Sequence, residues 1–160
     1  MKIIYKKGNL LEAPERCLLQ GTNCQGVMGS GVAKAIREKY PEVYPPYRKK
    51  FEEEGLRLGE TIWVMCHDGK IVVNCNTQEF YGKDGRRYVD YDAVRKVMKN
   101  VNANFALNQT VESYRDLMGE YGDSVALPKL GAGLGGGSWE IIEAIIEEEL
   151  VVVQPVVYEI

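Results

Sequence analysis

The chain has 160 residues, of which 45% are hydrophobic and 27% are charged, a composition typical of one globular domain with its own core. Its formal net charge of -3 argues against the broad basic face that binding to a nucleic-acid backbone requires. No apolar stretch approaches the roughly 18 residues of a membrane helix. The apolar run at the N-terminus is too short for a signal peptide, so we expect a cytoplasmic protein with no membrane association.

The chain has no internal repeat, low-complexity segment or linker, and we expect residues 1–160 to form a single domain. Its four cysteines lie at least seven residues apart with no C-x-x-C pair: Cys17, Cys24, Cys66 and Cys75. Without an export signal, such cysteines are typical of reduced, buried thiols rather than of a zinc site. We therefore expect neither a metal nor a cofactor.

The first half of the chain predicts strands at residues 2–6 and 17–23. A helix follows, in which Val32, Ala33, Ile36 and Tyr40 recur at helical spacing before Pro41. Residues 44–54 predict a short amphipathic helix that ends at Gly55. Residues 61–67 and 70–75 predict a hairpin, and the Asp68-Gly69 pair between them is typical of a type I′ turn.

The second half predicts a helix that begins after Asp90, a plausible N-cap. Its apolar stripe consists of Val94, Val97, Met98, Val101 and Phe105. A further helix covers residues 111–118, and residues 124–128 predict a buried strand. Trp139, Ile142, Ile145 and Ile146 mark the last helix, and residues 151–158 are rich in β-formers, with Pro155 expected to interrupt them. This alternation predicts an α/β sandwich with a mixed sheet.

Two glycine clusters each follow a predicted strand and precede a predicted helix. We call residues 26–31 (Gly-Val-Met-Gly-Ser-Gly) the first glycine loop and residues 131–137 (Gly-Ala-Gly-Leu-Gly-Gly-Gly) the second glycine loop. Glycine allows a close approach of the backbone to a ligand, and the N-terminus of a helix offers free N–H groups to a phosphate. One cluster alone is better explained as a tight turn. Two in equivalent positions favour a single diphosphate ligand held from both sides.

Other nucleotide-binding motifs fit this sequence poorly. The second glycine loop runs into Ser138-Trp139 without the lysine of a P-loop. The first has the order G-x-x-G-x-G, and no acidic residue ends a strand about 20 residues later, so a Rossmann dehydrogenase is a weaker alternative.

Four segments carry a resemblance to a known family: residues 8–11, 23–33, 76–78 and 127–139. In this order, over nearly the whole chain, they resemble the macrodomain family, in particular the ADP-ribose-1″-phosphate phosphatase-like proteins and the terminal ADP-ribose protein glycohydrolase. The resemblance implies a three-layer α/β/α sandwich with a mixed central sheet and a cleft for ADP-ribose. It implies these ligand-binding residues: Asn9, Leu10, Asn23, Gln25, Gly26, Val27, Gly29, Ser30, Gly31, Val32, Asn76, Thr77, Gln78, Gly131, Ala132, Gly133, Leu134, Gly135, Gly136 and Gly137.

By the same resemblance, Asn9 and Leu10 would lie near the adenine, and Asn23 would bind the distal ribose. Many macrodomains have aspartate at the position of Asn9, whose side-chain oxygen still accepts a hydrogen bond without charge. The terminal ADP-ribose glycohydrolase uses a lysine and an aspartate. We align these positions with Gln78, or alternatively Glu79, and with Gly135, so lysine-adduct chemistry is not expected.

No acid–base pair for hydrolysis is evident in the sequence. The single histidine, His67, is expected at the surface beside the hairpin turn, and helix capping accounts for Asp90. Asn23 is the weak catalytic candidate, as a group that orients water or substrate. We expect Cys24 and Cys75 to be buried packing residues.

Three functions remain open from the sequence. The first is hydrolysis of ADP-ribose-1″-phosphate or another ADP-ribose derivative. The second is a module that binds ADP-ribose, free or on an ADP-ribosylated protein, without catalysis. The third, single-stranded nucleic-acid binding, is disfavoured by the net negative charge.

Overall fold

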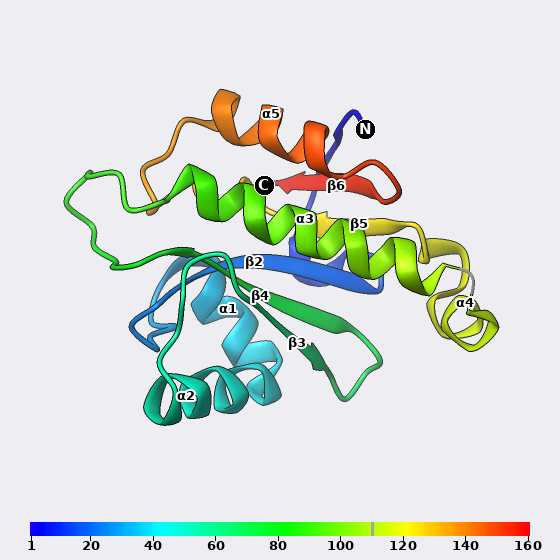
Figure 1. Ribbon diagram of the computed structural model, residues 1–160, viewed down its shortest axis with the longest axis horizontal. Helices are drawn as coiled ribbons and strands as arrows, with labels where there is room; N and C mark the ends of the chain where they lie inside the picture. Colours follow the sequence, from blue (N-terminus) through cyan, green and yellow to red (C-terminus); the bar gives the residue numbers. More distant parts are fainter. Residues whose placement is uncertain (110) are drawn as a thin grey trace.

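A six-stranded sheet runs through the middle of the molecule in the order β1-β6-β5-β2-β4-β3 (Figure 1). The computed structural model describes residues 1–109 and 111–160. The strands are β1 (Ile4–Lys7), β2 (Cys17–Asn23), β3 (Thr61–Met65), β4 (Ile71–Gln78), β5 (Ser124–Leu127) and β6 (Gln154–Glu159). All neighbouring pairs are parallel except β3 with β4, which form the antiparallel edge. The predicted mixed sheet is confirmed.

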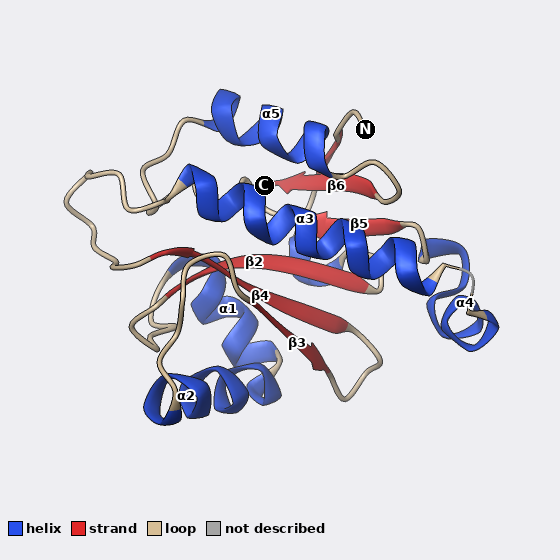
Figure 2. Ribbon diagram, viewed as in Figure 1, coloured by secondary structure: helices blue, strands red, loops and turns tan. Residues whose placement is uncertain are grey.

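Helices cover both faces of this sheet (Figure 2). One face carries α1 (Gly31–Lys39) and α2 (Tyr44–Glu53); the other carries α3 (Tyr91–Asn108) and α5 (Trp139–Glu149). The short α4 (Glu112–Met118) follows α3. The structure is therefore the predicted three-layer sandwich. No helix among residues 1–109 and 111–160 has the length and apolar character needed to cross a bilayer.

The two faces of the sheet have separate cores because successive strand residues point to opposite sides. Leu18 and Val72 pack with Ile36 of α1 and Tyr47 of α2. Their chain neighbours Leu19 and Val73 pack on the other side, with residues of α3 and α5. These strand residues are fully buried. At these positions the central strands are thus apolar on both faces, as expected for strands that helices cover on either side.

The hairpin between β3 and β4 forms as predicted, but the predicted type I′ turn is wrong. A type I′ turn needs positive φ at two residues, and only Gly69, with φ of 88°, has it here. The amide of Gly69 donates to the carbonyl of Cys66, and the amide of Cys66 donates to the carbonyl of Lys70. The loop is one residue longer than expected: an ordinary turn followed by a left-handed glycine, which spares Asp68 a strained conformation.

The expected interruption at Pro155 was also wrong, since Pro155 is the second residue of β6. The amide of Gln154 donates to the carbonyl of Asp123 on the β5 side. The nitrogen of the next residue, Pro155, therefore faces β1, whose pairing with β6 begins only opposite Val156. No ladder hydrogen bond is lost there, so proline is tolerated.

The topology brings the two glycine loops together. β2 and β5 are adjacent and parallel, with Leu18 opposite Ala126, so they end at the same edge of the sheet. The first glycine loop connects β2 to α1, and the second connects β5 to α5. Residues about a hundred positions apart thus flank one space at the carboxyl ends of the strands, where open α/β sheets bind ligands.

Candidate functional site

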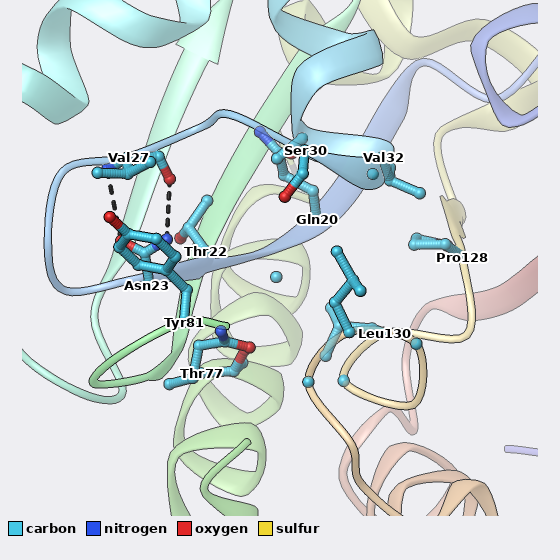
Figure 3. A pocket seen from close by; sticks show the side chains of 18 of the residues that line it. Gln20, Thr22, Asn23, Val27, Ser30, Val32, Thr77, Tyr81, Pro128 and Leu130 are labelled. Atoms are coloured by element: carbon cyan, nitrogen blue, oxygen red, sulfur yellow. Dashed lines mark hydrogen bonds between the residues drawn. The ribbon is translucent and has the colours of Figure 1, made fainter. Parts of the chain in front are cut away.

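A cavity of about 620 Å³ lies between the two glycine loops (Figure 3). Its volume is within the range of small-molecule sites. It brings together twelve of the residues predicted for the ligand: Asn23, Val27, Gly29, Ser30, Gly31, Val32, Thr77, Gln78, Gly131, Gly133, Leu134 and Gly135.

Eight other predicted residues do not line this cavity: Asn9, Leu10, Gln25, Gly26, Asn76, Ala132, Gly136 and Gly137. The side-chain oxygen of Asn9 accepts a hydrogen bond from the amide of Leu11, 3.0 Å away, and so caps a 3-10 helix. Asn76 is fully buried and accepts from the hydroxyl of Thr22 at 2.7 Å. The roles that the resemblance implies for Asn9 and Leu10 at the adenine stay predictions.

Asn23 holds the first glycine loop in shape. Its Nδ2 donates to the carbonyl of Val27 at 2.8 Å, and its Oδ1 accepts from the amide of Gln25 at 2.9 Å. The buried hydroxyl of Tyr47 donates to both oxygens of Asn23, at 2.5 Å to the backbone and 2.9 Å to Oδ1. Nδ2 has a second hydrogen, and Asn23 is among the residues that line the cavity (Figure 3). Asn23 therefore organises the loop and still offers one donor to a ligand.

Different constraints explain the glycines at different positions of the two loops. A Cβ on Gly26 would lie 2.8 Å from the ring of Phe51, and one on Gly136 would lie 2.3 Å from the carbonyl of Arg86. Packing explains these two. Gly29 and Gly133 have neither positive φ nor a crowded Cβ position, yet both line the cavity. Their open surroundings are what a close ligand would require.

The N-terminus of α1 opens onto the cavity. Ser30, the N-cap, makes no side-chain capping bond, and the first amide to bond back to it is that of Lys34. The amides of Gly31, Val32 and Ala33 belong to the first turn, which has no intrahelical acceptors, and all three residues line the cavity. Free amides and the positive end of the helix dipole suit an anionic group such as a phosphate.

Gln78 and Gly135 lie close together at the cavity wall. A Cβ on Gly135 would lie 3.1 Å from Oε1 of Gln78 and 2.7 Å from the carbonyl of Gly131. These are the positions aligned above with the lysine and aspartate of the terminal glycohydrolase. The backbone of the second glycine loop leaves no room for an aspartate at residue 135, so the path of the backbone excludes that side chain as well.

Several residues of the cavity were not predicted from the sequence as ligand-binding residues. The polar ones among them are Gln20, Thr22, Tyr81, Lys83 and Lys129. Gln20 and Thr22 lie within β2, which reads as a buried strand and carries no local signal of a ligand contact. Tyr81 and Lys83 belong to the segment between β4 and α3, whose path over the cavity follows from tertiary packing. Pro128 and Leu130 add an apolar wall from the β5 side (Figure 3).

The described residues that line the cavity include no Asp, Glu or His; the ionisable ones are Tyr81, Lys83 and Lys129. Lys129 pairs with Glu159 at 2.6 Å. His67 lies away from the cavity, where its Nδ1 pairs with Glu42 at 2.8 Å, and Asp90 accepts from the amide of Ala93 at 2.9 Å as the N-cap of α3.

The cysteines near the cavity are not activated nucleophiles. Burial raises the pKa of the Cys75 thiol to about 12. Burial, reinforced by the carboxylates of Glu79 and Glu60, raises the pKa of Cys24 to about 12 as well. Both thiols are therefore protonated near pH 7. Among the residues that the structure describes, no group of three or more His, Cys, Asp or Glu side chains is arranged for a metal ion.

The family model of the macro domain matches residues 20–146, which include both glycine loops. The chain belongs to the macro domain family. Among curated proteins, this macro domain is 30% identical over 145 residues to a DNA ADP-ribosyl glycohydrolase of Mycobacterium tuberculosis, covering 88% of the chain and 36% of that protein. It is 23% identical over 162 residues to the ADP-ribose 1″-phosphate phosphatase of Saccharomyces cerevisiae, covering 91% and 92% of the two chains.

Solved structures agree with this assignment. The macrodomain of Thermus aquaticus DarG superimposes with a TM-score of 0.77 at 27% identity, covering 99% of this chain and 98% of that one. A Bacteroides thetaiotaomicron protein of unknown function reaches a TM-score of 0.81 at 29% identity over the whole chain. The macro domain described here spans just over a third of the length of the curated glycohydrolases that it matches, 36% for the Mycobacterium tuberculosis protein.

Proposed function

We propose that this macro domain binds ADP-ribose in the cavity between its two glycine loops and hydrolyses a bond at the distal ribose of an ADP-ribose derivative. The observation that carries the proposal is the pair Gly29 and Gly133, one in each loop. Neither is required by backbone strain or packing, and both leave space at the cavity wall. A diphosphate between them would meet backbone amides rather than side chains.

The named activities of two relatives support a hydrolase. One acts on ADP-ribosyl groups of DNA, and the other on ADP-ribose 1″-phosphate. In this chain, the N–H of Asn23 that the first loop leaves free would orient the distal ribose or a water. Lys83 would stabilise developing negative charge. With no carboxylate or histidine among the described lining residues, catalysis would rest on orientation and electrostatic stabilisation.

A non-catalytic ADP-ribose module is the second candidate. The same absence of an acid–base pair among the described lining residues favours it, because binding needs only the loops and the amides of α1. The two candidates share the cavity and differ in turnover.

A panel of three substrates separates these candidates. The purified protein is incubated with ADP-ribose 1″-phosphate, an ADP-ribosylated DNA oligonucleotide and a peptide carrying ADP-ribose on glutamate. We expect release of phosphate, oligonucleotide or peptide from at least one substrate, and no release by the Gly133→Glu variant. Tight binding of ADP-ribose with no release from any substrate would favour the non-catalytic module. Failure to bind ADP-ribose would contradict both.

The DNA-linked substrate needs no basic groove on the protein. The ADP-ribosyl group itself would supply most of the binding, so the net charge of -3 is compatible with an oligonucleotide as the leaving group. Direct binding of unmodified nucleic acid remains disfavoured by that charge. An unmodified oligonucleotide therefore serves as the control, and we expect it not to compete with ADP-ribose.

A further inference from the structure

Gln20 lies on β2 at the floor of the cavity and is 1% exposed. Its side-chain oxygen, Oε1, has no hydrogen-bond partner among the described residues. Buried polar atoms in folded proteins are nearly always paired, because leaving one unpaired costs the full penalty of its desolvation. Gln20 is also one of the residues that line the cavity, so we take the missing partner of its buried Oε1 to be a donor that the ligand brings.

The orientation of this amide follows from its neighbours. Nδ2 of Asn74 donates to the backbone carbonyl of Val43, 3.3 Å away. A carbonyl only accepts, so Asn74 must turn its NH₂ toward Val43 and its Oδ1 toward Gln20. Nε2 of Gln20 then donates to Oδ1 of Asn74 at 2.7 Å. A flip of either amide would place two donors or two acceptors face to face, so the acceptor of Gln20 is the atom left free.

A fixed acceptor selects the chemistry of its partner. An ionised diphosphate has only acceptor oxygens and would be repelled by Oε1, whereas a hydroxyl or an amino group would be bound. Gln20 lines the cavity together with Ser30 and Val32 of the first glycine loop and α1 (Figure 3). The ligand atom that pairs with Oε1 is therefore a hydroxyl or an amino group and not a phosphate oxygen, while the phosphates meet the free amides of α1 and of the glycine loops.

We propose that Gln20 is a specificity-determining residue that accepts a hydrogen bond from a ribose hydroxyl or the adenine amino group of the ligand. The proposal rests on the proposed function, since it needs an ADP-ribosyl ligand in the cavity. Asn74 acts through Gln20 as a positioning residue, because its bond to Nε2 fixes which end of the Gln20 amide is left free to accept.

The test is a set of titrations with Gln20→Met, which keeps the length of the side chain and removes the acceptor. The ligands are ADP-ribose, its inosine analogue without the amino group, and analogues that each lack one ribose hydroxyl. We expect Gln20→Met to weaken ADP-ribose by about fivefold to tenfold. We also expect one analogue to bind equally to the variant and the wild type, which would identify the donor.

Equal weakening of every ligand by Gln20→Met, or no weakening at all, would overturn the proposal, because a packing effect or a bridging water would then account for Gln20. Thermal unfolding checks that the variant is folded. If Gln20→Met does not fold, the wild-type titrations still test the proposal. A wild type that binds ADP-ribose and all the analogues with equal affinity makes no hydrogen bond to the groups that the analogues lack, and this result would also overturn the proposal. Absence of ADP-ribose binding by the wild type would instead contradict the proposed function itself.

Discussion

Gly133 offers the sharpest test of the cavity at the scale of one residue. Its φ is not positive, and a Cβ there meets nothing within 4 Å, so Gly133→Glu fits the fold without strain. The carboxylate would occupy the cavity and repel a diphosphate. We expect affinity for ADP-ribose to fall at least tenfold while the free energy of unfolding changes by less than about 1 kcal/mol. Calorimetric titration and urea unfolding measure the two quantities.

Gly133→Ala is the matched control and should keep most of the affinity. Wild-type affinity in Gly133→Glu would contradict the assigned cavity. Gly31→Glu would be a poorer test. The φ of Gly31 is 60°, so any side chain there adds a strain of about 1–2 kcal/mol and confounds binding with stability.

Asn23 shows why a catalytic candidate needs a structural control. Its oxygens accept from Tyr47, whose hydroxyl is buried. We expect Tyr47→Phe to lower the free energy of unfolding by about 1–3 kcal/mol, because it leaves buried oxygens of Asn23 without that donor. Urea unfolding measures the loss. Tyr44→Phe, which removes a longer bond of 3.2 Å to the carbonyl of Gly26, should cost less. An equal loss in both variants would argue against a special role for Tyr47.

At the scale of elements, substitutions at Asp90 test whether this residue has only a structural role. Its carboxylate caps α3 through the amide of Ala93. Asp90→Ala should lower the free energy of unfolding by about 0.5–2 kcal/mol and leave affinity for ADP-ribose unchanged. Chemical unfolding and titration measure these effects, and Asp90→Asn, which keeps a capping oxygen, should restore most of the stability. A loss of affinity without a loss of stability would mean that Asp90 serves the site.

The elements themselves were largely predictable. Apolar spacing indicated α3 and α5, Asp90 indicated the start of α3, and the two strand–loop–helix units indicated where the glycine loops lie. The turn at Asp68 and the strand through Pro155 were not predictable in the same way. Each depends on hydrogen bonds to partners outside the local pattern, the Cys66–Lys70 pairing in one case and the late start of β1 in the other.

The site was predictable where its residues share a local motif and not elsewhere. Glycines 29, 31, 131, 133 and 135 carry a pattern, and the structure brings them to one cavity. Gln20 reads as an ordinary strand residue, and only its pairing with Asn74 and its unpaired oxygen mark it out. Lys83 reaches the cavity from a long segment whose course no local periodicity encodes.

At the scale of the whole molecule, the buried thiols predict loss of stability in alkali. Cys66, like Cys24 and Cys75, has its pKa raised by burial to about 12, from an ordinary value of 9.0. The unfolded chain releases these protons near pH 9, while the folded chain keeps them. The stabilisation is complete below that pH and is lost as pH rises from about 9 toward 12.

Urea unfolding at pH values of about 7.5, 9 and 10.5 measures this dependence. The free energy of unfolding should fall mainly between pH 9 and pH 10.5, and the fall should be smaller in Cys75→Ala, which removes one such thiol. A free energy that stays constant up to pH 10.5 would contradict the burial of the thiols.

The central claim is that the two glycine loops hold one ADP-ribose between them. Calorimetric titration of the wild-type protein with ADP-ribose, AMP and ribose-5-phosphate tests it most directly, because each smaller ligand has only part of the diphosphate and one ribose. We expect ADP-ribose to bind at least tenfold more tightly than either fragment, with one site per chain. ADP-ribose that binds no more tightly than AMP would contradict the claim.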